Sequence, residues 1–121
     1  MSSPAPTTHH QRPADLASTA AMVESAAGVF AMLADATRVR IILALGQGEL
    51  SVGQLAEAAG KSPTVVSQHL AKMRLASMVA CRHEGTRVFY RLVDEHALEL
   101  VTQAMYQAEH AATGVPPHHQ H

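Results

Sequence analysis

Two helix-start patterns separated by a glycine lie near the middle of the chain, and they constrain the fold more than any other feature. Ser51 with Gln54 three residues later is a capping-box pattern that opens a short helix. Gly60 then turns the chain, and Ser62 followed by Pro63 opens a second helix with proline at its first position. A short helix, a tight turn and a second helix form the helix-turn-helix arrangement.

A β-hairpin is predicted directly after the second helix. Residues 78–82 and 87–93 are rich in β-branched and aromatic side chains, and the turn between them, residues 83–86, contains Gly85. With the helices this gives a mainly α fold with one β-hairpin, a winged helix-turn-helix. The expected order is three helices, the recognition helix, the hairpin and a last helix. The expected helices are Leu16–Leu33, Ala36–Leu45, Ser51–Ala58, Pro63–Ala76 and Glu95–Ala112.

Apolar side chains at helical spacing predict which faces are buried. The expected inward positions are Val23, Ala26, Phe30 and Leu33; Val39, Ile42 and Leu43; Val66, Leu70 and Met73; and Leu98, Val101, Met105 and Ala108.

The length of 121 residues fits one compact domain. We expect residues 1–14 to be a disordered arm, residues 15–112 to form the domain and residues 113–121 to be a flexible histidine-rich tail. No stretch is expected to span a membrane, and the N-terminus does not resemble a signal peptide. The single cysteine, Cys81, excludes an internal disulfide, is interpreted as a small core residue, and fits a cytoplasmic location.

Charge is distributed unevenly along the chain. Residues 61–91 carry six Lys or Arg side chains against one acid, Glu84, whereas no Lys or Arg follows Leu92. The segment after Leu92 instead carries acids and five histidines. The first segment suits phosphates and the second suits cations, so double-stranded DNA and a metal ion are the expected partners.

The recognition helix and the wing supply the candidate DNA contacts. Short polar side chains and an amide suit base edges, whereas Lys and Arg suit phosphates. The candidates are Ser62, Thr64, Ser67, Gln68, His69 and Lys72 on the helix and Arg82 and Arg87 on the hairpin. A plain solvated helix face is the alternative, and the ordered set of helix, turn, capped helix and basic hairpin favours DNA.

Three stretches resemble the ArsR/SmtB family of metalloregulatory repressors. They are Leu33-Ala34-Asp35-Ala36-Thr37-Arg38, Val66-Ser67-Gln68-His69-Leu70-Ala71-Lys72-Met73-Arg74 and Gly85-Thr86-Arg87-Val88-Phe89-Tyr90-Arg91-Leu92. The resemblance spans about residues 30–110. It implies a homodimer with its interface on the first and last helices, whose paired recognition helices read an inverted repeat.

Histidines on the last helix point to metal binding between subunits. His96 and His110 lie fourteen residues apart, so on an ideal helix their directions differ by about 40° but their positions by roughly 21 Å along the axis. One ion needs ligands about 2 Å away. An antiparallel copy of the helix would bring His96 of one subunit near Gln107 and His110 of the other.

The resemblance extends to the ligand set. Asp94 and His96 match an Asp-x-His pair of the family and His110 matches its last ligand, while Gln107 stands where another ligand is found. Similarity to the family's nickel- and cobalt-sensing subgroup implies His96, Glu109, His110, His118 and His119 as ligands, with Asp94 either ligand or helix cap. Five or six N/O ligands suit Ni(II) and Co(II) better than tetrahedral Zn(II).

The expected function is a repressor that binds operator DNA as a metal-free dimer and is released by Ni(II) or Co(II), with control of metal efflux implied by the resemblance. A Zn(II)-responsive repressor and a winged-helix regulator with a non-metal effector are the alternatives. No catalytic motif is found, so an enzyme is not expected.

Overall fold

The computed structural model describes the backbone of residues 12–114 and the side chains of residues 15–114. The chain divides into two compact units, one ending at Met32 and one beginning at Leu33. Of the expected disordered arm and histidine-rich tail, residues 1–11 and 115–121 lie outside the described residues. Residues 12–14 are helical, so the first helix begins earlier than Leu16.

Helix α2, Arg12–Leu33, supplies the described residues of the first unit, and its last residue, Leu33, belongs to the second. The expected inward face is only partly confirmed: Leu33 is buried, whereas Ala26 is exposed and Val23 and Phe30 are 59% and 60% exposed. By length and composition alone, Asp15–Leu33 is also apolar enough to cross a membrane, contrary to the expectation that no stretch is. The core helix of a soluble protein and a signal sequence near the N-terminus meet the same criterion.

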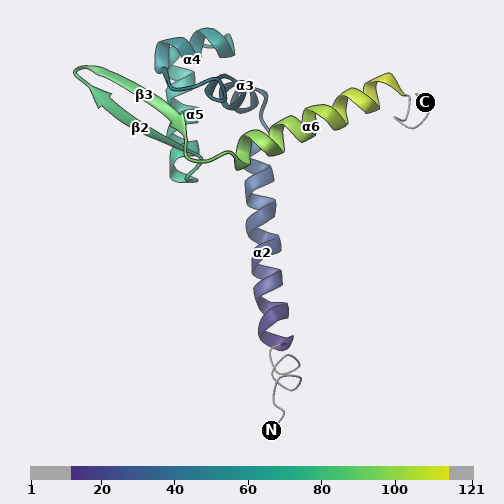
Figure 1. Cartoon of the computed structure of the whole chain (residues 1–121). Helices are drawn as coiled ribbons and strands as arrows, with labels where there is room; N and C mark the ends of the chain where they lie inside the picture. The colour runs from purple at the N-terminus through teal and green to yellow at the C-terminus, as the bar shows by residue number, and fades with distance from the viewer. Residues whose placement is uncertain (1–11, 115–121) are drawn as a thin grey trace. The chain divides into compact units, whose positions relative to one another are not determined.

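The second unit holds the helix-turn-helix and the hairpin (Figure 1). Helices α3, α4 and α5 gather together, the hairpin of β2 and β3 extends from them, and α6 begins beside α3. The elements are α3 Ala36–Leu45, β1 Leu50–Ser51, α4 Val52–Ala59, α5 Pro63–Leu75, β2 Val79–Glu84, β3 Arg87–Leu92 and α6 His96–Thr113.

The helix caps confirm the local sequence patterns. The Ser51 side chain accepts from the Gln54 backbone N–H at 3.2 Å, and the Gln54 side chain accepts from the Ser51 N–H at 2.9 Å. Gly60 ends α4 in the left-handed region at φ 66°, where a side chain is strained. The Ser62 hydroxyl then accepts from Val65 N–H at 3.2 Å, which sets the start of the recognition helix.

The sheet has three strands in the order β1-β3-β2, one more than the sequence predicts. Strand β1 pairs antiparallel with β3 through Leu50 and Ser51. The hairpin turn is also tighter than expected, because Glu84 pairs with Arg87 and only Gly85 and Thr86 lie between the strands. Gly85 has φ +63°, a conformation that tight hairpin turns require.

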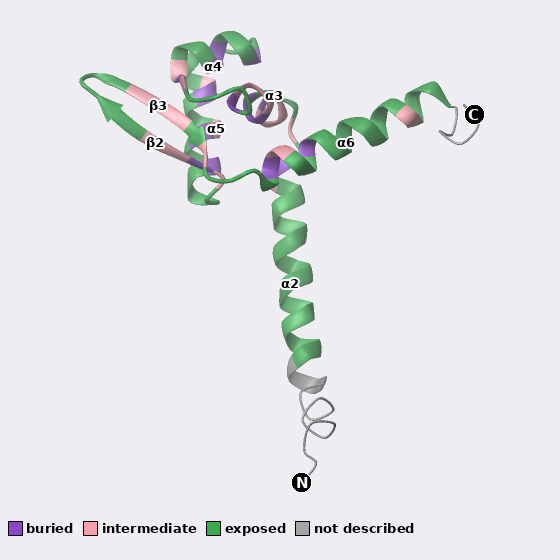
Figure 2. Ribbon diagram, in the orientation of Figure 1, coloured by how far each residue is buried: buried purple, intermediate pink, exposed green. Residues whose placement is uncertain are grey.

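The core lies between α3, α4 and α5, as the purple segments of Figure 2 show. Its fully buried side chains are Ile41, Ile42, Leu55, Val66, Leu70 and Met73. The expected inward face of α5 is therefore confirmed. On α3 the prediction was partly wrong, because Ile41 and Leu45 are buried beside Ile42, whereas Val39 and Leu43 are half-buried.

Helix α6 is buried only near its start. Ala97 and Val101 are buried, whereas Met105 and Tyr106 are 50% and 56% exposed, so the predicted apolar stripe is only partly covered within one chain. Cys81, on β2, is half-buried and makes no disulfide.

Candidate functional site

The recognition helix α5 has one buried face and one open face. Val66, Leu70 and Met73 are fully buried. The predicted contact residues Ser62, Thr64, Ser67, Gln68 and Lys72 are all exposed. Packing thus holds the helix rigidly while its polar side chains remain available to a partner, which is the geometry that major-groove reading requires.

His69 lies differently from the other candidates on this helix. It is half-buried, and its Nδ1 accepts a hydrogen bond of 3.0 Å from Nε of Arg38 on α3. Arg38 belongs to the first turn of α3, where the Asp35 carboxylate accepts from the Arg38 N–H at 3.0 Å. That backbone hydrogen bond, assisted by the positive charge of Arg38, lowers the pKa of Asp35. The sequence did not predict this link between two helices.

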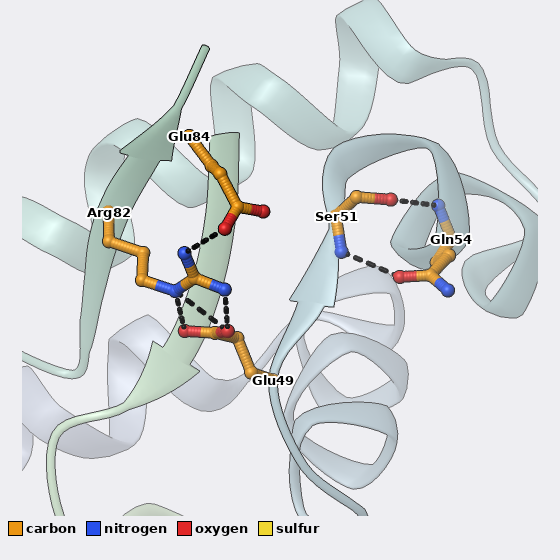
Figure 3. A network of polar contacts seen from close by, with 5 residues as sticks. All are labelled: Glu49, Ser51, Gln54, Arg82 and Glu84. Carbon is orange, nitrogen blue, oxygen red and sulfur yellow. Dashed lines mark hydrogen bonds and ion pairs between the residues drawn. The ribbon is translucent and has the colours of Figure 1, made fainter. Parts of the chain in front are cut away.

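Arg82 on the wing is engaged by two carboxylates (Figure 3). Its Nη2 lies 2.8 Å from Glu49 Oε1, and its Nε donates to both Glu49 oxygens at 2.9 Å. The second carboxylate belongs to Glu84, two residues along the same strand, whose Oε2 lies 3.5 Å from Arg82 Nη1. The hydrogen bond from Arg82 lowers the pKa of Glu49, and Glu49 in turn raises the pKa of Arg82. Sequence reasoning missed Glu49 because it precedes β1, far along the chain from the wing.

Phe89 lies under two of the three arginines of the wing, which is the hairpin of β2 and β3. The guanidinium carbons of Arg82 and Arg87 lie 4.7 Å and 4.9 Å from the centre of its ring, within cation–π range. Within the described part of the chain Arg82 is the one arginine of the hairpin strands that forms ion pairs, and Arg87 and Arg91 form none.

The candidate metal ligands on α6 are separated as the helix geometry predicts. His96 is exposed at the first position of the helix, and His110 is half-buried fourteen residues later, 5.6 Å from the Tyr106 ring. The N-cap residue of α6 is Glu95 and not Asp94. The Asp94 Oδ1 nevertheless accepts a hydrogen bond of 2.9 Å from the His96 N–H. Between residues 12 and 114, no three His, Cys, Asp or Glu side chains gather around a point that could hold one ion.

Glu109 faces the apolar side of α6. It lines an open groove of about 420 Å³ with Thr102, Met105 and Tyr106 of the same helix and Leu43 of α3. As adjacent helix residues, Glu109 and His110 point about 100° apart. His118 and His119 lie outside the described residues.

Comparisons with known proteins agree with this geometry. Residues 35–80, from the start of α3 to the start of β2, match the family described as "Bacterial regulatory protein, arsR family". The chain is 54% identical over 91 residues to the HTH-type transcriptional regulator KmtR of Mycobacterium tuberculosis, covering 75% of this chain and 70% of that protein. It is 39% identical over 90 residues to the cadmium resistance transcriptional regulatory protein CadC homolog of Staphylococcus aureus, covering 73% and 74%.

A solved structure is similar over most of the chain. It is the homodimeric winged helix-turn-helix DNA-binding domain of Mb0332 from Mycobacterium bovis, described as a possible ArsR-family transcriptional regulator. The TM-score is 0.69 at 31% identity, over 80% of this chain and 90% of that one.

Proposed function

This chain belongs to the ArsR family of bacterial regulatory proteins, and from that premise we propose that it represses transcription as a metal-free dimer and leaves its operator when Ni(II) or Co(II) binds. Its relatives and its fold are those of DNA-binding regulators and not of enzymes. A metal-efflux gene is the proposed target, and the cytoplasm the proposed location.

The open face of α5 is the observation that carries the DNA-binding part. The side chains proposed to contact DNA are Ser62, Thr64, Ser67, Gln68, His69, Lys72, Arg82 and Arg87. Polar side chains on the exposed face of a rigid helix reach base edges, and Lys72 and Arg87 reach phosphates. Glu49 competes with a phosphate for Arg82.

The exposed apolar side chains of α2 and α6 support a homodimer. Leu16, Met22 and Phe30 on α2 are each at least 60% exposed. On α6, Met105 and Tyr106 are at least half exposed. Burying apolar surface of this kind against a second copy of the chain would stabilise a dimer. The similar Mb0332 domain is a homodimer. Dimerisation would also account for a helix as apolar as α2 in a protein that stays in solution.

Metal binding is proposed between the two subunits. The proposed ligands are Asp94, His96, Glu109, His110, His118 and His119. His96 and His110 of one chain are too far apart for one ion, so a symmetric dimer would hold two sites, each with ligands from both last helices. Imidazole and carboxylate donors in this number suit six-coordinate Ni(II) or Co(II). A coupling of about 3 kcal/mol between metal and DNA would weaken the operator complex on the order of a hundredfold.

Operator binding by the purified protein, with and without each metal, tests the proposal. We expect an inverted-repeat fragment from the protein's own promoter region to be bound without metal and released by Ni(II) and Co(II). Release by Zn(II) alone would support the zinc alternative, and absorption of the Co(II) form reports the coordination number. A protein that binds the operator equally with all three metals would instead take a non-metal effector.

A further inference from the structure

The hydrogen bond between Arg38 and His69 fixes the position of a proton. Arg38 Nε carries a hydrogen and can only donate, so the Nδ1 atom of His69, 3.0 Å away, is an acceptor and holds no proton. A neutral imidazole has one N–H group. His69 in this arrangement therefore carries its hydrogen on Nε2.

The Nε2 atom of His69 is open to solvent. Among residues 12–114 no protein group accepts a hydrogen bond from it, and no buried polar side-chain atom in that part of the chain is left without a partner. Since His69 is half-buried, its Nε2–H must reach water. Lys72, a proposed phosphate contact, lies three residues later and thus on the same side of the helix.

We infer that Arg38 is a positioning residue that fixes the tautomer of His69, so that His69 presents Nε2–H as a donor to an acceptor atom of the operator. The acceptor is a phosphate oxygen or a base-edge atom such as guanine N7 or O6. The inference rests on the proposed DNA binding and adds the donor atom and the residue that orients it. Arg38 suits this role because a guanidinium never accepts a hydrogen bond, so the polarity of the contact cannot reverse.

The tautomer can be measured without DNA. Long-range ¹H–¹⁵N spectra of the imidazole distinguish the two neutral forms, and the His69 signals are assigned by their loss in His69→Gln. We expect the Nε2–H form in the unmodified protein, and a mixture of both forms in Arg38→Met. Arg40→Met is the matched control, because Arg40 is an exposed arginine of the same helix. An Nδ1–H tautomer in the unmodified protein overturns the inference.

DNA binding tests the donor role. In His69→Gln the side-chain amide nitrogen stands near the position of Nε2 and keeps a donor, whereas in His69→Asn it stands near Nδ1. We expect His69→Asn to weaken operator binding about tenfold and His69→Gln to weaken it much less, as for loss or retention of one hydrogen bond. Equal binding by the unmodified protein and His69→Asn overturns the inference.

Two kinds of DNA identify the acceptor. If His69→Asn loses affinity for the operator alone, the contact is at a base, and if it loses affinity equally for unrelated duplex DNA, the contact is at a phosphate.

The salt dependence of DNA binding tests the role of Arg38. In Arg38→Met it should stay that of the unmodified protein, because a positioning residue neutralises no phosphate. A slope lower by about one unit would make Arg38 a phosphate contact and overturn its positioning role. Failure of the unmodified protein to bind any operator would instead contradict the proposed function.

Discussion

Arg82 Nη2 and Glu49 Oε1 lie 2.8 Å apart, although the two residues are 33 positions apart in the sequence. The contact joins the wing to the segment between α3 and β1 and places a carboxylate against one of the three arginines of the hairpin strands. An exposed ion pair of this kind contributes little to stability. Its larger effect is on how strongly the wing attracts phosphates.

Glu49→Gln should strengthen DNA binding. Removing the carboxylate frees Arg82 and deletes a negative charge beside the wing, so we expect affinity to rise about two- to fivefold, in line with the worth of an exposed ion pair. The salt dependence should steepen by up to about one unit. Glu57→Gln, an exposed acid of α4, is the control. Weaker binding by Glu49→Gln would mean that the pair orients the wing.

His96→Ala should keep operator binding and lose metal-induced release. The substitution removes a proposed ligand at an exposed position of α6, so the fold should be unaffected. Titration of the protein–operator complex with Ni(II) measures the effect, with His83→Ala, a histidine outside the proposed ligand set, as the control. Unchanged release by Ni(II) would show that the proposed sensing site is wrong.

Gln107→His should increase the response to Zn(II). An amide is a poor zinc ligand, and Gln107 stands where the family resemblance implies a further ligand. A histidine there completes a set of four with Asp94, His96 and His110, which suits tetrahedral Zn(II). Competition against a zinc indicator measures the affinity. No gain over the unmodified protein would argue against pairing of the last helices in the proposed register.

Leu70→Ala should destabilise the domain by about 2–5 kcal/mol, because Leu70 is fully buried at the centre of α5. Leu75→Ala is the matched control at the end of the same helix. Leu75 is 88% exposed, and its truncation should change stability by less than about 0.5 kcal/mol. Urea unfolding compares the two, and similar losses would contradict the packing of α5.

Asp35 should make stability depend on pH in the acid range. Its pKa is lowered in the folded chain below the ordinary 3.8, chiefly by the hydrogen bond from the Arg38 N–H. The stabilisation is therefore complete above 3.8 and is lost as the pH falls through the folded pKa. Asp35→Asn keeps a capping side chain but does not titrate. Its free energy of unfolding should therefore fall less steeply as the pH decreases, and the fall should begin at the same pH or lower. An unchanged pH profile would mean that Asp35 contributes nothing.

Local patterns predicted the helices well, because caps and turns depend on residues close in sequence. Ser51 with Gln54 and Ser62 with Pro63 opened the helices where expected. The burial of α3 was harder to predict. Apolar residues occupy more than one side of this helix. Packing against α4, α5, α6 and β3 leaves Ile41 and Leu45 covered and Val39 half-buried.

Contacts between distant segments could not be read from the sequence. Strand β1 has two residues and exists only through its pairing with β3. The partners of Arg38 and Arg82 lie 31 and 33 residues away, and no periodic pattern links such positions. His96 and His110, the candidate ligands near the two ends of α6, were predicted to lie on one continuous helix, and they do.

The two-residue turn at Gly85 and Thr86 restricts how the wing can change in length. Arg82 and Phe89 face each other across the hairpin, so their side chains emerge on one side of it, and those of Cys81 and Tyr90 emerge on the other. Inserting one residue into β2 would exchange the sides for every position beyond it. Regulators that evolve or are engineered from this scaffold to reach further along a groove must therefore lengthen each strand by an even number of residues, or carry a bulge.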